Sequence, residues 1–542
     1  MIQKNSPGDY PGQDNSNSPP MNRATTSTIP CFFSHPAQVW WILLFALFTR
    51  LLLAPHFLLV PDEANYWQWS RHLALGYHDH PPMIAWLIRL STMALGQTEL
   101  AVRLPTILGI TAASVYMALL TARFSNWTDA RALALASQLP LMINGSALIA
   151  TPDGLLLPCW AAACYHAIVA VEQGSRRHWL MTGLWFGLGM LSKYTMLLFL
   201  PGLFFFLLFS KTSRQELLHP WPWLGLLLSI IVFSPVLIWN ANNEWTTFRH
   251  VLYQGGMGST TTLTLRFLGD YLLVQILLIS PVFAGLLVRT WLRPIKTSPL
   301  ERDRFRYLQW NSLFVFILFL ILSFHVRIYG NWPAPAYCTA LILIAIHRDD
   351  IPTSGSSRLW RIGIGTAFFI TLPVILQLLY PVLPLPIKLD RVARETCGWK
   401  TLATHVHQEL QEMESPSKTF VFGLRYQTAS ELAFYMPGQK ETVSMNRWTR
   451  PNVYDFWFND QDVLGKDAVG IYIWKGMEKR LAPLFERSAP VKTIHLYRHS
   501  PWFGKQLIQT YYLFRGYGFK GGLRWQPQVE NDIRNTRHQR EN

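Results

Sequence analysis

The chain has 542 residues, of which 50% are hydrophobic and only 15% are charged, and its formal net charge is +16. Soluble domains carry about 25% charged residues, so this composition argues against an ordinary soluble protein. A basic chain can bind nucleic acid, but no basic run here is dense enough to follow a phosphate backbone. The charge accompanies long apolar runs and 23 Trp residues, so we expect a membrane as the partner and no nucleic acid.

The N-terminal part predicts a tail followed by repeated crossings of a membrane. Residues 1–36 are rich in Ser, Asn, Pro and Thr, which predicts a disordered tail. A span needs about 20 mostly apolar residues. The first apolar run is longer than a signal-peptide core and lacks a small-residue cleavage site, so we expect it to remain uncleaved. Eleven spans are predicted, at about 37–59, 99–121, 131–150, 154–171, 178–192, 194–210, 221–239, 267–289, 308–325, 332–347 and 358–380.

The predicted connections alternate in charge. Lys and Arg concentrate in every second connection, and the positive-inside rule places these connections and the N-terminal tail in the cytoplasm. An odd number of spans then places the C-terminus outside. The segments expected on the outer side are the first outer loop (60–98), "TPDG" (151–154), "SKY" (192–194), the loop 240–266 and "HVRIYGNWP" (325–333). Acids, cations and histidines therefore gather on one face of the membrane, where we expect the chemistry.

The C-terminal part differs in character from the rest. Charged residues become common from about residue 385, after a transmembrane module over 37–384. Strands are predicted at 418–424, 468–474 and 491–497, and a helix at 426–436. The sequence therefore predicts a small extracytoplasmic α/β domain over 385–542. It contains no catalytic motif, so we expect a lid or a module that positions the acceptor.

Three carboxylates lie at predicted outer ends of spans. Asp62 and Glu63 directly follow Pro61, and Asp153 lies just before the fourth span. The first two are interpreted either as a solvated helix-end pair or N-cap, or as functional groups. Acids at a membrane boundary are costly unless they are solvated or paired. Two separate carboxylates on one face suit an acid/base site or a metal site.

The segment "HDHPP" (78–82) returns the chain to the membrane. Its residues His78, Asp79 and His80 are interpreted either as a metal or phosphate cluster, or as an exposed turn set by the two prolines. The spacing does not match a zinc-binding helix motif.

Several cationic residues also have two interpretations. Lys193 lies between two apolar segments, where a lysine either extends to the headgroups or holds an anion. His325 and Arg327 have the same two interpretations, and Arg249 and His250 lie in the loop 240–266. These cations suit a phosphate leaving group. The chain has no GxSxG, P-loop or GxGxxG motif, so soluble nucleotide chemistry has little support.

Five stretches together carry a resemblance to a known family. They are "PDEANYWQWSRHLALGYHDHPP", "TPDGLLL", "GLGMLSKYT", "GNWPAPAY" and "YQTASELAFYMPG". They resemble the bacterial polyprenyl-phosphate glycosyltransferases of the dolichyl-phosphate-mannose-protein mannosyltransferase superfamily, which have the GT-C fold. Within this superfamily the chain resembles the lipid A aminoarabinose and galacturonic acid transferases, and the resemblance covers about residues 40–540.

The resemblance implies a mainly α polytopic membrane protein of about 11 spans with a C-terminal α/β domain. It also implies an enzyme that moves a sugar, with inversion, from a polyprenyl-phosphate donor to a lipid A, glycan or protein acceptor. The reaction is expected on the periplasmic face of the bacterial inner membrane.

The resemblance also assigns residues. Asp62 matches the essential carboxylate of the first outer loop, Asp153 the second acid, and Lys193 the lysine that meets the lipid phosphate. Asp79 and His250 match an acidic residue and a histidine near a metal, so a divalent metal is the one cofactor suggested. Glu63 is a further catalytic candidate. The donor phosphate is expected to contact Lys193, Arg327, His80 and Arg249.

One position departs from the aminoarabinose transferases. They have a lysine before the proline of the returning segment, where this chain has His80. This departure leaves open how the donor phosphate is held and whether the sugar is aminoarabinose.

Two other functions could use the same outer surface or the same spans. A transporter or flippase of a lipid-linked saccharide favours charged residues and broken helices near the midplane. A non-catalytic partner in export or polymerisation could use the same outer surface. The ionisable residues here cluster at span ends, which favours the enzyme over the transporter.

Overall fold

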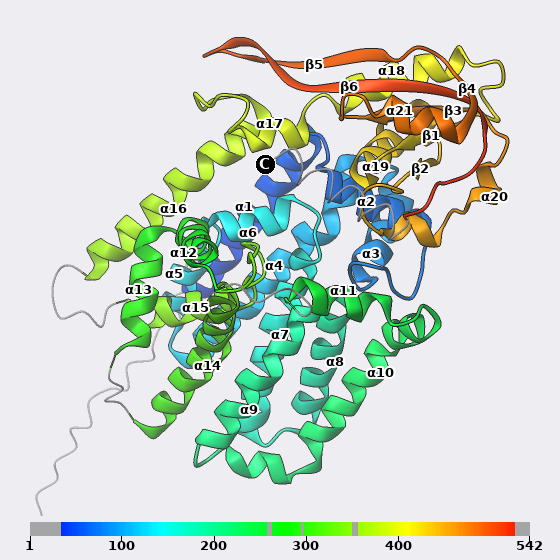
Figure 1. Cartoon of the computed structure of the whole chain (residues 1–542). Helices are drawn as coiled ribbons and strands as arrows, with labels where there is room; N and C mark the ends of the chain where they lie inside the picture. Colours follow the sequence, from blue (N-terminus) through cyan, green and yellow to red (C-terminus); the bar gives the residue numbers. More distant parts are fainter. Residues whose placement is uncertain (1–33, 257–262, 294–297, 349–355, 526–542) are drawn as a thin grey trace, which may run out of the picture.

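The computed structural model describes residues 34–256, 263–293, 298–348 and 356–525. A large helical part carries a smaller region with a β-sheet at one end (Figure 1). Positions 1–33 of the tail predicted over 1–36 lie outside the described residues. The helices of the large part are α1 (His35–Leu53), α2 (Pro61–Arg71), α3 (Met83–Leu95), α4 (Glu99–Phe124), α5 (Trp127–Ser137), α6 (Leu141–Leu148), α7 (Asp153–Gln173), α8 (Arg176–Ser192), α9 (Phe199–Phe209), α10 (Pro220–Asn242), α11 (Thr246–Gln254), α12 (Leu265–Ile279), α13 (Pro281–Trp291), α14 (Pro299–Leu322), α15 (Ala336–Ile346) and α16 (Ser356–Leu379).

Several of these helices can cross a membrane. Within the described residues, six helical segments are long and apolar enough, and a bent pair raises the number to seven. They are His35–His56, Glu99–Phe124, Asp153–Gln173, Pro220–Asn242, Pro299–Leu322 and Arg358–Leu379, with Leu265–Ile279 and Pro281–Trp291 as the bent pair. The prediction of a helical multi-pass membrane protein is confirmed, whereas the number of eleven spans is not.

Two predicted spans are interrupted. The continuous span predicted over 267–289 is wrong, because α12 and α13 meet at an angle of 104°. Ser280 has a φ of 99° at this break and Pro281 follows it, so the α12 hydrogen-bond pattern cannot continue. The span predicted over 131–150 is likewise divided into α5 and α6, with Pro140 directly before the second helix.

The helix α7 lies at the centre of the membrane part. Of its most apolar 18-residue window, 83% is buried inside the protein, compared with 22% for α10. Beside it, α8 and α10 approach closely at Gly183 and Gly225, where an added Cβ on Gly183 would lie 2.0 Å from the carbonyl oxygen of Gly225. Small residues at such crossings let membrane helices pack tightly. The first residue of α7, Asp153, is therefore held in a well-packed position.

The segment 60–98, predicted as the first outer loop, folds into two helices, α2 and α3. Pro61 is the first residue of α2, where its missing N–H costs nothing. Three positions after Val60, the Glu63 carboxylate accepts a hydrogen bond of 2.9 Å from the Val60 N–H. The helix thus begins directly after the first membrane segment, and it places Asp62 in its first turn.

The C-terminal region is built on a six-stranded sheet of order β2-β1-β3-β6-β4, with β5 paired to β6. The first three strands in the chain pair in parallel, and β6 runs antiparallel to its neighbours. Its elements are α17 (Arg391–Thr396), α18 (Trp399–Gln411), β1 (Phe420–Gly423), α19 (Tyr426–Tyr435), β2 (Thr442–Ser444), α20 (Asp460–Val463), β3 (Ala468–Tyr472), α21 (Glu478–Leu481), β4 (Phe485–Ser488), β5 (Lys492–Ser500) and β6 (Gly504–Phe519).

Strands β1, β3 and β5 and helix α19 lie where the sequence predicts them. The 16-residue strand β6 was not predicted. In Figure 1 the long β5–β6 hairpin extends over α17, and α19 lies beside α2. Among the contacts between the two parts of the chain, the one between α2 and α19 bears on the site. The domain boundary near residue 385 stays a prediction.

Candidate active site

A buried ion pair lies where α7 begins. The Asp153 side chain accepts hydrogen bonds of 2.7 and 2.9 Å from Lys193 Nζ, and one of 2.7 Å from Asn331 Nδ2. Asp153 is 1% exposed and Lys193 is 6% exposed. Buried charges require such partners because desolvation is costly. Lys193 therefore points into the protein and does not extend to the headgroups.

Asp62 opens into a cavity between the two parts of the chain. The cavity has a volume of about 730 Å³ and is lined by residues of α2, α17, α19 and the β5–β6 hairpin. The Tyr426 hydroxyl lies 3.5 Å from Asp62 Oδ1. Asp62 is accessible from this cavity, yet desolvation by the surrounding protein raises its pKa, and the charges of Glu395 and Asp79 raise it further, while Arg450 and Tyr426 oppose the rise. A carboxylate with a raised pKa suits a general base.

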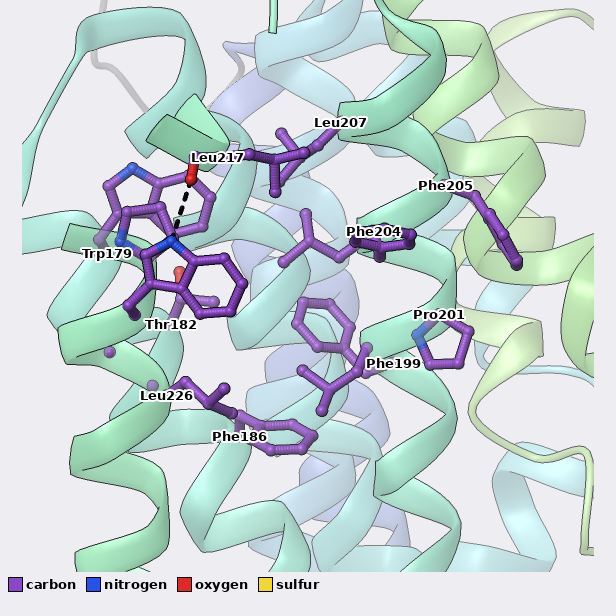
Figure 2. A pocket seen from close by; sticks show the side chains of 16 residues that line it. Trp179, Thr182, Phe186, Phe199, Pro201, Phe204, Phe205, Leu207, Leu217 and Leu226 are labelled. Atoms are coloured by element: carbon purple, nitrogen blue, oxygen red, sulfur yellow. Dashed lines mark hydrogen bonds between the residues drawn. The ribbon is translucent and has the colours of Figure 1, made fainter. Parts of the chain in front are cut away.

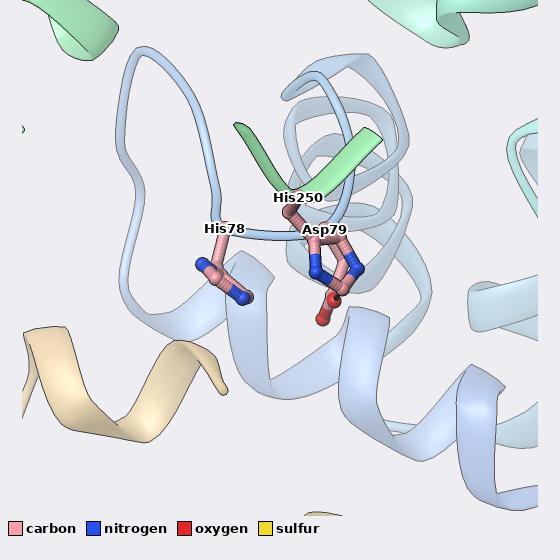
Figure 3. A group of neighbouring side chains, drawn as sticks. All are labelled: His78, Asp79 and His250. Carbon is pink, nitrogen blue, oxygen red and sulfur yellow. Dashed lines mark ion pairs between the residues drawn. The ribbon is translucent and has the colours of Figure 1, made fainter. Parts of the chain in front are cut away.

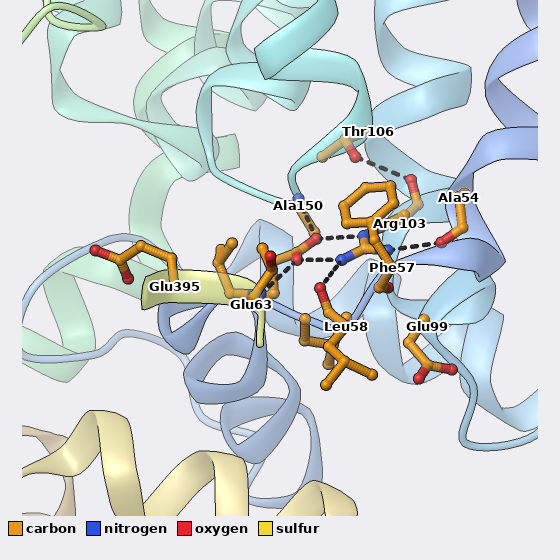
Figure 4. A network of polar contacts seen from close by, with 12 residues as sticks. Ala54, Phe57, Leu58, Glu63, Glu99, Arg103, Thr106, Ala150 and Glu395 are labelled. Atoms are coloured by element: carbon orange, nitrogen blue, oxygen red, sulfur yellow. Dashed lines mark hydrogen bonds and ion pairs between the residues drawn. The ribbon is translucent and has the colours of Figure 1, made fainter. Parts of the chain in front are cut away.

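Glu63, the neighbour of Asp62, has a different environment (Figure 4). Arg103 donates to both its oxygens, at 2.8 Å to Oε1 and 2.7 Å to Oε2. The N–H of Ala150 also donates to Oε1, at 2.8 Å. Both side chains of this ion pair are fully buried. Arg103 further donates to three backbone carbonyls of the chain entering α2, at Ala54, Phe57 and Leu58.

These contacts tie the start of α2 to α4 and to the loop before α7. Of the two interpretations of Glu63, the geometry favours the structural one over the catalytic one. Asp62 and Glu63 are adjacent in sequence, yet only Asp62 faces the cavity.

Asp79 and His250 are brought together, with His78 as a third neighbour (Figure 3). Their ligand atoms lie within 4.8 Å of one another, and His250 Nε2 lies 3.2 Å from Asp79 Oδ1. Burial alone would raise the pKa of Asp79, but the His250 hydrogen bond and the charge of Arg450 hold it well below its usual range. Two imidazoles and a carboxylate form a ligand set that suits a divalent transition metal.

His80 lies between these two groups of residues. Burial lowers its pKa to about 4, the charge of Lys193 lowers it further, and Asp79 and Asp153 oppose that shift. Its imidazole is therefore neutral near pH 7. At the position where the resemblance predicts a lysine in the aminoarabinose transferases, this chain therefore has an imidazole whose positive charge is disfavoured.

The remaining predicted phosphate ligands are exposed. Arg249 lies 4.0 Å from Glu244, and both side chains are largely accessible to solvent. Arg327 is exposed in the segment between α14 and α15. Their assignment to the donor phosphate stays a prediction.

The sequence patterns did not identify three residues of the site. Asn331 binds Asp153, and Tyr426 and Arg450 of the C-terminal region approach Asp62 and Asp79. The motif "GNWPAPAY" contains Asn331 and "YQTASELAFYMPG" begins with Tyr426, so both lie in stretches already noted for the resemblance. Arg450 lies in none of these stretches.

A second cavity lies away from these residues, between α8, α9 and α10 (Figure 2). Its volume is about 490 Å³, and its described lining contains no ionisable side chain. Phe186, Phe199 and Phe204 contribute to this lining. Such a surface suits a hydrocarbon chain, whereas the reacting groups require the polar site above.

Comparisons with known proteins agree with this architecture. Residues 79–239 match the family model of the dolichyl-phosphate-mannose-protein mannosyltransferases. The chain is 28% identical over 291 residues to a lipid A galacturonosyltransferase of Rhizobium johnstonii, covering 52% of this chain and 59% of that relative. It is 32% identical over 189 residues to the undecaprenyl phosphate-α-4-amino-4-deoxy-L-arabinose arabinosyl transferase of Pseudomonas aeruginosa, covering 30% of this chain and 33% of the relative.

The fold is also similar to that of a solved protein. The crystal structure of ArnT from Cupriavidus metallidurans in the apo state matches with a TM-score of 0.62 at 14% sequence identity, covering 88% of this chain and 98% of that chain. The same protein bound to undecaprenyl phosphate matches with a TM-score of 0.60. By contrast, the curated relatives are matched over at most 59% of their length. The chain is a multi-pass membrane protein with this fold, and its resemblance to the GT-C polyprenyl-phosphate-sugar glycosyltransferases is confirmed.

Proposed function

We propose that the chain is a glycosyltransferase that moves a sugar from a polyprenyl-phosphate donor to an acceptor of the bacterial envelope. The observation that carries this proposal is the convergence of Asp62, at the wall of a cavity, with the buried Asp153–Lys193 pair and the Asp79–His250 pair. The charges of Asp62, Asp79 and Asp153 all raise the pKa of the buried Tyr66, which indicates that the three carboxylates surround one small region. We infer from the charge alternation of the connections that the reaction takes place on the periplasmic face of the inner membrane.

The relatives support the choice of substrates. Their names specify lipid A as an acceptor and an undecaprenyl phosphate-linked aminoarabinose as a donor. The solved ArnT was also obtained with undecaprenyl phosphate bound. The lining of the cavity at Asp62 contains apolar residues, such as Ile149, Leu378 and Ile508, and three cationic ones, Arg391, Arg394 and Arg425. A cavity with both kinds of side chain suits an amphiphilic acceptor.

Asp62 acts as the general base in this mechanism. It accepts the proton of an acceptor hydroxyl while the hydroxyl oxygen attacks the anomeric carbon from the face opposite the phosphate. The bond between that carbon and the phosphate oxygen breaks, and the electron pair leaves with the polyprenyl phosphate. The configuration is therefore inverted. A positioned general base contributes about 10²–10⁴-fold to the rate.

Lys193 and His80 stabilise the departing phosphate. The ammonium group of Lys193 has three N–H donors, so one stays available beside its contacts with the two Asp153 oxygens. A divalent metal held by His78, Asp79 and His250 would supply further positive charge for the phosphate. Fixed donors toward a leaving charge contribute roughly 10²–10³-fold each.

The test uses purified chain in proteoliposomes with a polyprenyl-phosphate-linked sugar and lipid A, without an ion gradient. We expect glycosyl transfer that is lost in the Asp62→Asn variant. Movement of the intact lipid-linked sugar across the bilayer without transfer would instead establish a flippase. The absence of both activities would leave a non-catalytic partner.

A further inference from the structure

The C-terminal region reaches the candidate base through two side chains. Tyr426, the first residue of α19, places its hydroxyl 3.5 Å from Asp62 Oδ1. Arg450 donates from Nη2 to that hydroxyl at 3.3 Å, and its guanidinium lies 5.3 Å from the centre of the Tyr426 ring. The other arm of Arg450 lies 3.6 Å from Asp79 Oδ1. A continuous row of polar groups therefore joins Asp62 to Asp79.

The helix that carries Tyr426 is held firmly against α2. Trp67 and Phe434 pack edge to face with ring centres 4.9 Å apart. Tyr435 Oη accepts a hydrogen bond of 2.7 Å from the Leu59 N–H, two residues before α2 begins. Both contacts lie at the C-terminal end of α19 and fix this helix against α2, and Tyr426 lies at the other end of the helix.

The direction of the hydrogen bonds is set by Arg450. A guanidinium can only donate, so the Tyr426 oxygen accepts from Arg450 and its own proton is free to point elsewhere. Asp62 is the acceptor within reach. Burial raises the pKa of Tyr426 above its usual value, which keeps the phenol protonated and able to donate. The contact of 3.5 Å is long, and such contacts commonly tighten when substrate binds.

We propose that Tyr426 and Arg450 are positioning residues for Asp62, so that the C-terminal region completes the active site and is not merely a lid. This inference rests on the proposed role of Asp62 as the base. Tyr426 holds Oδ1 and leaves Oδ2 for the acceptor hydroxyl. Arg450 orients Tyr426 and, through Asp79, links the base to the histidine cluster that faces the donor.

The charged surroundings of Asp62 make the inference testable by pH. Desolvation by the surrounding protein, Glu395 of α17 and Asp79 of the segment between α2 and α3 all raise the pKa of Asp62. Arg450 and Tyr426 are the two groups that lower it. Removal of either group therefore raises the pKa of Asp62 further. The rate should then fall at a higher pH on the acidic side of its profile, because only the ionised carboxylate accepts a proton.

The experiment measures kcat against pH for the full chain in nanodiscs, with saturating donor and acceptor. Tyr426→Phe should shift the acidic limb upward by about 0.5–1 pH unit, since one hydrogen bond is lost. Arg450→Gln should shift it at least as far, and Arg450→Lys should shift it less because the positive charge remains. The KM for the donor should change little in Tyr426→Phe.

The matched control is Tyr472→Phe, which removes a buried phenolic hydroxyl of the C-terminal region that contacts Glu478 at 3.3 Å and takes no part in holding α19 against α2. It should leave the acidic limb in place even if the thermal unfolding temperature falls. An unshifted limb in Tyr426→Phe, or an equal shift in Tyr472→Phe, overturns the inference. If the unaltered chain shows no transfer at all, the proposed function fails instead, so the two failures are distinguishable.

Discussion

Tyr426 and Asp62 are separated by 364 positions in the chain, yet their side-chain oxygens lie 3.5 Å apart. One belongs to the sheet-containing C-terminal region and the other to the first helix after the first membrane segment. The candidate active site thus combines the first helix after the first membrane segment with the C-terminal region. The cavity of about 730 Å³ at Asp62 is walled by both.

Asp62→Asn keeps the size of the side chain and removes its charge. We expect glycosyl transfer to fall at least about a hundredfold, because a general base is lost. Donor binding and protein level should be largely retained. Glu414→Gln, at an exposed acid in the C-terminal region, is the control and should transfer normally. Near-normal turnover of Asp62→Asn would reduce Asp62 to a helix-end residue.

Glu63→Gln should affect stability more than chemistry. The change leaves the fully buried Arg103 without its counter-charge, which typically costs about 3–5 kcal/mol. We expect a lower unfolding temperature in detergent and less folded protein. Turnover per folded molecule should stay close to normal. An unchanged unfolding temperature with a large loss of kcat would contradict the structural role.

Lys193→Met should weaken binding of the donor lipid by about 1.5–3 kcal/mol, the usual contribution of a charge-assisted hydrogen bond. The single change also leaves the buried Asp153 without its cation. The double variant Asp153→Asn/Lys193→Met removes that imbalance. It should recover folded protein without recovering donor binding. Lys193→Arg should bind donor better than Lys193→Met, and equal, normal binding by both would refute a phosphate contact.

The lowered pKa of His80 predicts that donor binding depends on pH. Burial lowers its pKa to about 4 in the free protein, so it is neutral at pH 7. A bound phosphate favours the protonated imidazole and raises this pKa, so binding takes up a proton and tightens as pH falls from 8 to 6. Titration of donor lipid at several pH values measures the effect.

The lipid phosphate also titrates, so donor affinity depends on pH even without His80. The slope of donor affinity against pH in His80→Gln measures this contribution of the phosphate. The unaltered chain should have the steeper slope. His405→Gln, at an exposed histidine of α18, should keep that slope. Identical slopes for the unaltered chain and His80→Gln would remove His80 from the donor site.

The orientation in the membrane is also testable. Charge alternation predicts the chain beyond residue 385 on the outer side. An alkaline phosphatase fused after residue 400 should be active, since this reporter folds only outside the cytoplasm. Activity of a cytoplasm-specific reporter at the same position would reverse the orientation and move the site to the other face.

The sequence by itself determined the features that depend on neighbouring residues. Long apolar runs predicted the multi-pass helical architecture, because a span is defined by about 20 consecutive residues. One of the interpretations of Asp62 and Glu63, an N-cap, placed the start of a helix after the first span, and α2 begins there at Pro61 with Glu63 bound to the Val60 N–H. Alternating apolar segments predicted β1, β3, β5 and α19. The family resemblance singled out Asp62, Asp153 and Lys193 as candidates.

Tertiary structure alone decided how these candidates are used. Asp62 and Glu63 are neighbours with the same chemistry, but one meets a cavity and the other meets Arg103, 40 positions away. Lys193 was equally compatible with the headgroups and with an anion until its contact with Asp153 was seen, 40 positions away. Partners for a buried charge are set by which helices pack together, and no local pattern encodes that. The roles of Asn331, Tyr426 and Arg450 therefore emerged only when distant segments were brought side by side.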